Sequence, residues 1–175
     1  FETTDGDIIL QSSDKVQFRV FKNILSLVSP FFHNMFTLPS QADQPQVQVV
    51  ECTEDGRVLQ VILQCCYPPV ASSAGMAAPK IKELDLDLTW RCLEATIKFE
   101  LETVQPRFEQ QFGDLCYEQP LACFAISTIR GWKEHAKKTA DLLLQIAIPF
   151  GSPVKELDGL AAFDFHRLIS YHICC

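Results

Sequence analysis

The sequence predicts an α+β fold, in which a short β-sheet is wrapped by helices and is followed by an all-helical extension. Two observations support this prediction. Residues 16–20 alternate apolar and polar side chains, as a half-buried strand does, and residues 7–12 form a second short strand. Further along the chain, apolar residues recur at the three- and four-residue spacing of amphipathic helices.

The elements before residue 53 are short. A polar turn at 13–15 joins the first two strands into a hairpin, and two short helices follow. Ser29 and Pro30 form a pattern typical of a helix N-cap followed by proline at the first helical position. Residues 47–50 predict a third strand.

The rest of the chain is expected to be helical. Thr53 is the expected N-cap of a helix that ends near Tyr67, and the Ala-, Ser-, Gly- and Pro-rich segment 70–80 predicts a flexible loop. Further helices are expected over residues 84–99, 103–112, 120–129, 132–146 and 160–173, with a break at 149–153. The predicted domains are therefore residues 5–112, which contain the sheet, and a helical extension over 113–175.

Composition restricts the class of partner. The chain has 175 residues, of which 47% are hydrophobic and 21% charged, as in ordinary globular proteins. A net charge of -7 repels nucleic acid, and the densest basic segment, with Lys133, Lys137 and Lys138, indicates a solvated helix face. No apolar run approaches the ~18–20 residues that span a bilayer. We therefore expect neither a nucleic-acid nor a membrane partner.

The eight cysteines indicate reduced thiols. None forms a Cys-x-x-Cys pair, two pairs are adjacent in sequence, and several lie in apolar runs, where small buried side chains occur. The first residues also lack the basic start and apolar stretch of a signal peptide. These features predict a cytoplasmic or nuclear protein.

Catalytic and metal-binding motifs are not found in the sequence. It contains no Gly-x-Ser-x-Gly, His-Glu-x-x-His or Gly-rich phosphate loop, so we expect neither an enzyme nor a cofactor or small-molecule substrate. A zinc site at His166, His172, Cys174 and Cys175 is an alternative. The six-residue spacing of the two histidines places them on different sides of a helix, which favours a packing segment. Cys65 and Cys66 are candidate redox sensors, but their apolar neighbours favour inert burial of at least one.

A series of motifs in a fixed order resembles the BTB/POZ domain family. They are Asp7-Ile8-Ile9-Leu10, Phe18 to Lys22, Leu25, Ser29-Pro30-Phe31-Phe32 and Met35-Phe36 in the first 40 residues, then Cys66-Tyr67 and the segment with Leu93, Ala95, Lys98 and Phe99. The resemblance covers residues 5–112. The remainder resembles the helical tail of BTB proteins expanded in mushroom-forming (basidiomycete) fungi.

The resemblance implies a partner interface formed by Asp7, Lys22, Phe31, Phe32, Met35 and Phe36. In the family, the strand aspartate pairs with the lysine in a charged pocket near the dimer interface, and a solvated pair is the alternative for Asp7 and Lys22. Adjacent positions of a helix diverge by about 100°, so two of the four apolar residues are expected in the core, and for the other two a surface function and a structural role are equally open.

The function implied by the resemblance is protein–protein association: self-association, pairing with another BTB protein, or partner recruitment. A different interpretation is a substrate adaptor for a cullin-type ubiquitin ligase. The loop at 37–44 lacks the hydrophobic-x-Glu motif of cullin-binding members, which speaks against this adaptor role. Two further interpretations are a transcriptional co-regulator scaffold and a small metal or thiol protein. A second surface, around the helix at 56–67 and the C-terminal helices, is expected to recruit a partner.

Overall fold

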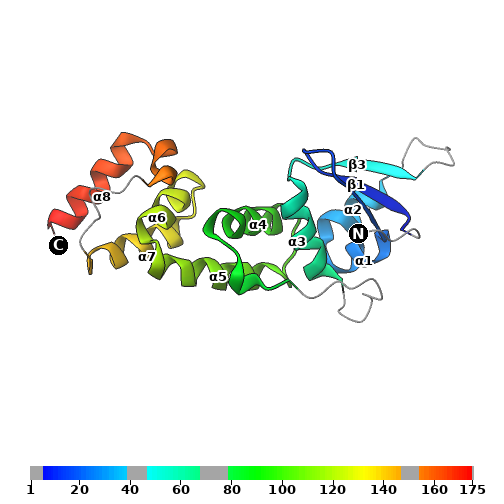
Figure 1. Ribbon diagram of the computed structural model, residues 1–175, viewed down its shortest axis with the longest axis horizontal. Coiled ribbons are helices and arrows are strands. Elements are labelled where there is room, and N and C mark those ends of the chain that lie inside the picture. The colour runs from blue at the N-terminus through cyan, green and yellow to red at the C-terminus, as the bar shows by residue number, and fades with distance from the viewer. Residues whose placement is uncertain (1–5, 39–46, 68–78, 147–153, 175) are drawn as a thin grey trace. The chain divides into compact units, whose positions relative to one another are not determined.

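The computed structural model describes residues 6–38, 47–67, 79–146 and 154–174 (Figure 1). The chain divides into two units, residues 1–109 and 110–175. The division lies within α5 (Gln105–Glu118), and so does the boundary that the sequence predicts after residue 112. None of the described helices has the length and apolar character needed to cross a membrane.

The sheet in the first unit has three strands in the order β2-β1-β3. They are β1 (Ile8–Gln11), β2 (Gln17–Val20) and β3 (Gln48–Glu51). β1 runs antiparallel to β2 and parallel to β3, and Ile8 lies opposite Val20 and Leu10 opposite Phe18. These four side chains are buried. The alternation in the sequence therefore identifies the side of the hairpin that faces the core.

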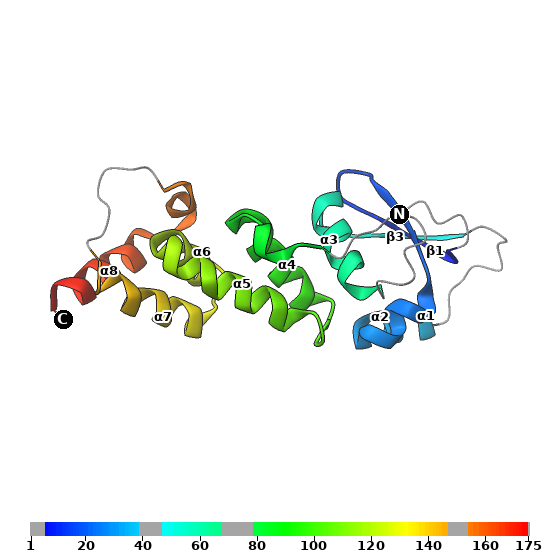
Figure 2. The ribbon, with the colours of Figure 1, turned by 60° about the horizontal axis from the view of Figure 1, so that its bottom comes forward.

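Two short helices follow the hairpin, and in both views they lie on the same side of the sheet (Figures 1 and 2). They are α1 (Lys22–Val28) and α2 (Pro30–Thr37). The hydroxyl of Ser29 accepts a 3.0 Å hydrogen bond from the backbone N–H of Phe32, so Ser29 is the N-cap of α2 and Pro30 is its first residue. This confirms the N-cap predicted at Ser29-Pro30.

The prediction of Thr53 as the next N-cap is wrong. Asp55 is the N-cap of α3 (Gly56–Cys66), and its carboxylate accepts a 3.0 Å hydrogen bond from the backbone N–H of Val58. Thr53 lies two residues too early to reach these groups. Its hydroxyl instead accepts a 2.7 Å hydrogen bond from the ammonium group of Lys98.

A short 3₁₀ helix, η2 (Ile81–Glu83), precedes α4 (Leu86–Lys98), whose N-cap is Asp85. The stripe that the helical spacing predicts is buried: Leu88, Cys92, Ala95 and Phe99 are all less than 4% exposed. Most of the loop expected at 70–80 lies outside the described residues.

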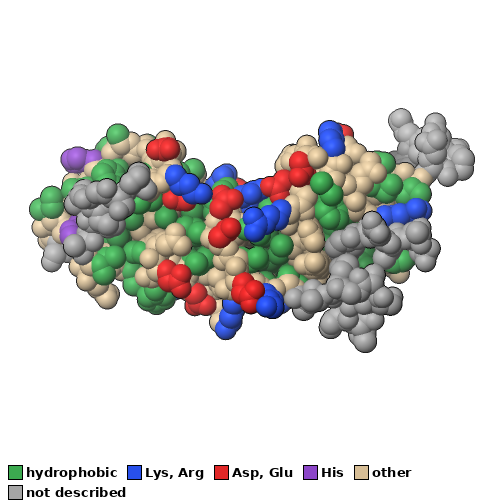
Figure 3. All heavy atoms as spheres, in the orientation of Figure 1, with side chains coloured by type: hydrophobic (Ala, Val, Ile, Leu, Met, Phe, Trp, Pro, Cys, Tyr) green, Lys and Arg blue, Asp and Glu red, His purple; other side chains and the backbone are tan. Residues whose placement is uncertain are grey.

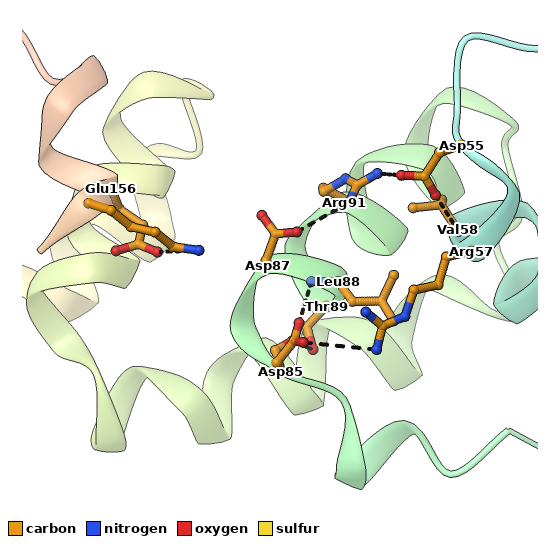
Figure 4. A network of polar contacts seen from close by, with 10 residues as sticks. Asp55, Arg57, Val58, Asp85, Asp87, Leu88, Thr89, Arg91 and Glu156 are labelled. Carbon is orange, nitrogen blue, oxygen red and sulfur yellow. Dashed lines mark hydrogen bonds and ion pairs between the residues drawn. The ribbon is translucent and has the colours of Figure 1, made fainter. Parts of the chain in front are cut away.

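Reciprocal ion pairs join α3 and α4 (Figure 4). Arg91 of α4 pairs with Asp55, the N-cap of α3, and is held by Asp87 one turn earlier at 3.2 Å. Arg57 of α3 lies 4.0 Å from Asp85, the N-cap of α4. Each capping carboxylate therefore faces an arginine from the other helix. On the face drawn in Figure 3, acidic and basic side chains are interspersed rather than separated.

The helix α5 continues six residues beyond its predicted end at residue 112. The apolar spacing of the helix continues past residue 112, since Leu115 and Cys116 follow Phe108 and Phe112 at three- and four-residue intervals. All four of these residues are buried. The sequence contains no helix-breaking proline between these residues, so nothing ends the helix before Pro120.

The second unit is helical, as predicted. Beyond α5 it consists of α6 (Pro120–Ile129), α7 (Lys133–Leu143), η3 (Lys155–Gly159) and α8 (Ala162–Cys174). α6 packs against α7 and η3 and is buried over most of its length. The core cluster of this unit contains Leu121, Phe124, Leu143 and Leu168. The break expected at 149–153 lies outside the described residues.

Candidate functional site

Apolar side chains are exposed along the α1–α2 pair. Leu27 at the end of α1 is 87% exposed, and Leu38 after α2 is 68% exposed. Phe31 and Met35 are half-buried and precede Leu38 by seven and three residues, so they form one stripe along α2. We call Leu27, Phe31, Met35 and Leu38 the α1–α2 surface. Isolated apolar residues are common at protein surfaces, but several on neighbouring elements indicate a contact site.

An aromatic cluster beneath this surface holds α2 in place. The ring of Phe32 lies 5.1 Å from that of Phe99 and 5.9 Å from that of Phe36, measured between centroids. The ring of Phe31 lies 5.6 Å from that of Phe99. Phe32 is only 3% exposed and is therefore a core residue of this unit, whereas Phe31, Met35 and Phe36 are half-buried.

The structure brings Asp7 and Lys22 together, but through the backbone of Lys22. A carboxylate oxygen of Asp7 accepts a 2.8 Å hydrogen bond from the backbone N–H of Lys22, the first residue of α1. The ammonium group of Lys22 instead donates to the side-chain oxygen of Gln48 at 3.3 Å and lies 5.8 Å from the centroid of the Phe36 ring. Asp7 therefore satisfies an N–H group that has no partner within α1.

A second contact fixes the start of α1. The hydroxyl oxygen of Tyr67 accepts a 2.9 Å hydrogen bond from the backbone N–H of Phe21. Burial raises the pKa of the Tyr67 phenol, which keeps this group protonated at neutral pH. Asp7 from β1 and Tyr67 from the end of α3 thus position the helix that presents Leu27.

Sequence reasoning missed Leu27 and Leu38 as surface residues. The helical spacing places Leu27 with Ile24 and Val28 on one face, which suggests a core position. In the structure Leu25 is the fully buried residue of α1. The four apolar residues of α1, at positions 24, 25, 27 and 28, span less than half of the helix circumference, so helical spacing alone gives no signal that separates the exposed Leu27 from the buried Leu25.

The thiols of the candidate redox pair, Cys65 and Cys66, show no sign of activation. Burial raises the pKa of Cys65 to about 11 and that of Cys66 to about 12, so both remain protonated at neutral pH. The cysteines that the structure describes are free thiols. Within the described part of the chain, no group of three or more His, Cys, Asp or Glu residues is placed to hold a metal ion, and Cys175 lies outside that part.

Comparison with known proteins identifies the family. The sequence model of the BTB/POZ domain matches residues 2–105, which is more than half of the chain. No curated protein sequence matches the chain significantly. The matched segment contains the three-stranded sheet and the helices α1 to α4, and it is a protein-interaction domain rather than an enzyme domain. The chain therefore belongs to the BTB/POZ domain family, whose members mediate protein–protein interaction and oligomerisation.

Proposed function

We propose that the chain self-associates through the α1–α2 surface and acts as an assembly module. The supporting observation is the exposure of Leu27 and Leu38 beside the half-buried Phe31 and Met35, in a domain whose family associates with proteins. Fully burying a leucine side chain contributes about 1.5–3 kcal/mol, so covering two leucines and part of the stripe supplies a substantial driving force.

A two-fold homodimer is the arrangement proposed. Two copies related by a two-fold axis present the same patch to each other, so each apolar residue of one copy faces apolar residues of the other. The neighbouring polar groups at the start of α1 are already satisfied, because Asp7 bonds to Lys22 and Lys22 bonds to Gln48. Covering this region would leave few buried groups without a partner.

Another BTB protein could occupy the same surface in place of a second copy. A cullin scaffold is less well supported, because residues 37–44 lack the hydrophobic-x-Glu motif of cullin-binding members. Residues 39–46 lie outside the described part of the chain.

The test is the mass of the full chain in solution, measured by light scattering over a concentration series. We expect a concentration-dependent dimer for the unmodified chain and a monomer for Leu27→Glu. Because Leu27 is exposed and Glu favours helices, the variant is expected to fold normally. Ile173→Glu is the matched control, because Ile173 is 77% exposed and lies on α8 in the other unit.

Two outcomes would overturn the proposal. One is a monomer for the unmodified chain at every concentration, which would leave a heterotypic partner for the surface. The other is a dimer that Leu27→Glu leaves intact, which would place the interface elsewhere. Phe32→Glu is not a useful interface variant, because Phe32 is buried and a charge there would disrupt the core.

A further inference from the structure

A groove of about 740 Å³ lies between α6, α7 and α8, within the unit 110–175. Its volume falls in the range of about 300–1,000 Å³ that is usual for ligand-binding clefts. Apolar side chains from all three helices line part of it: Phe124, Ala136, Ala140 and Leu168. Phe124 and Leu168 also belong to the core cluster of this unit, so that part of the wall is held in place by packing.

The charged residues that line the groove are mainly basic. Lys133 and Lys137 lie one turn apart on α7, and Arg167 comes from α8. Asp164 is the acidic lining residue, and its carboxylate lies 3.9 Å from the guanidinium group of Arg167, whose side chain is largely exposed. The two lysines have no ion-pair partner among the described residues. The groove therefore carries excess positive charge in a chain whose net charge is -7.

Two buried hydroxyl groups beside the groove lack a hydrogen-bond partner among the described residues. They belong to Ser127 and Thr128 at the end of α6, and neither oxygen has a partner among the described residues. Ser127 is completely buried. Buried hydroxyl groups are nearly always paired in folded proteins, and an unpaired one is destabilising, so the exceptions require an explanation. Because neither oxygen is exposed to solvent, these hydroxyl groups lie beneath the wall of the groove rather than at its surface.

We propose that this groove binds a short acidic segment of a partner protein. An apolar side chain of that segment would pack on Phe124 and Leu168, and its carboxylates would face Lys133, Lys137 and Arg167. A peptide combines apolar and anionic groups, and the chain belongs to a protein-interaction family. This inference does not depend on self-association.

The experiment pans a random dodecapeptide phage library on the full chain and measures the enriched peptides by fluorescence polarisation. The groove variant is Lys133→Glu combined with Lys137→Glu and Arg167→Glu. The control reverses three lysines outside the groove lining, Lys82, Lys138 and Lys155, and so has the same net charge. Ser127→Ala, at a buried position of α6, is a second control.

We expect enriched peptides that combine Asp or Glu with a large apolar residue. Their Kd should rise by about tenfold or more in the groove variant and by about twofold or less in the charge-matched control. Ser127→Ala should change the Kd by about twofold or less, because its side chain is buried beneath the groove wall and cannot contact the peptide. Leu27→Glu should bind as the unmodified chain does, which separates this test from that of self-association.

Three results would overturn the proposal. The first is a panning experiment in which no enriched peptide binds the unmodified chain more tightly than it binds the groove variant. The second is a set of enriched peptides without acidic residues. The third is complete displacement of the peptide by inorganic phosphate at micromolar concentration, which would identify a site for small anions.

Discussion

The hydroxyl group of Ser29 donates a 2.6 Å hydrogen bond to the carbonyl oxygen of Phe99. The hydroxyl oxygen also accepts the N–H group of Phe32, so one buried side chain caps α2 and satisfies a carbonyl at the end of α4. Phe99 also contacts the rings of Phe31 and Phe32. The orientation of α2, and with it the α1–α2 surface, depends on this contact.

Replacing Ser29 with alanine should therefore destabilise the chain. Both hydrogen bonds would be lost and the carbonyl of Phe99 would lose this partner, so we expect the free energy of unfolding to fall by about 2 kcal/mol. Urea denaturation measures this change. Ser26→Ala, at a half-buried position of α1, is the control and should change stability by less than about 0.5 kcal/mol. Equal effects of the two substitutions would show that the buried bond contributes nothing.

The ion pair between Asp55 and Arg91 should contribute measurable coupling between α3 and α4. Both side chains are about 30% exposed, so solvent screens the pair only in part. A double-mutant cycle with Asp55→Asn, which keeps the capping oxygen, and Arg91→Gln should give a coupling energy of about 1 kcal/mol. The control is the exposed pair of Lys80 and Glu83, for which we expect no measurable coupling because solvent screens both charges. A coupling for Asp55 and Arg91 no larger than this would contradict the prediction.

The buried thiol of Cys92 should make stability dependent on pH under alkaline conditions. Burial raises the pKa of Cys92 from the usual 9.0 to about 12. Because the folded pKa is the higher one, the stabilisation is complete below about pH 9 and is lost as the pH rises towards 12. Between about pH 8 and about pH 10, the free energy of unfolding of the unmodified chain should therefore fall, because the Cys92 thiol ionises in the unfolded state. The free energy of unfolding of Cys92→Ala should fall by about 1 kcal/mol less over the same interval.

Cys174→Ala provides the control for this pH dependence. Cys174 is exposed, so its removal should leave the difference between the two pH values unchanged. Urea denaturation at both pH values gives the comparison for each variant. If Cys92→Ala and the unmodified chain lose the same free energy between these pH values, the thiol of Cys92 does not titrate differently in the folded and unfolded states.

The unpaired hydroxyl of Ser127 should contribute nothing to the stability of the unliganded chain. Its removal in Ser127→Ala eliminates a buried polar group without a partner, so we expect stability to stay the same or rise by up to about 1 kcal/mol. Thr139→Val is the matched control. Thr139 is also buried, but its hydroxyl donates to the carbonyl oxygen of His135 at 2.8 Å, and we expect a loss of about 1 kcal/mol. A similar loss in Ser127→Ala would reveal a partner for Ser127 in the folded chain.

Local patterns in the sequence predict the elements that position the candidate site. The alternation at residues 16–20 identifies Phe18 and Val20 as buried, and Ser29-Pro30 marks the start of α2. Both patterns are predictive because strand alternation and helix capping depend on residues that are close together in the sequence. The cap at α3 was missed because Thr53 and Asp55 are both good capping residues, and the position of the first helical turn decides between them.

The sequence by itself determined the family of the chain, the order of its strands and helices, and the buried stripe of α4. These properties depend on periodicity and on ordered motifs within one segment. Only the tertiary structure decided that Leu27 is exposed while Leu25 is buried, and that Asp7 bonds to the backbone of Lys22. It also decided that Ser127, Lys133 and Arg167 line one groove. The physical reason is that exposure and side-chain contact depend on which helices pack together, and residues far apart in the sequence become neighbours only after the chain has folded.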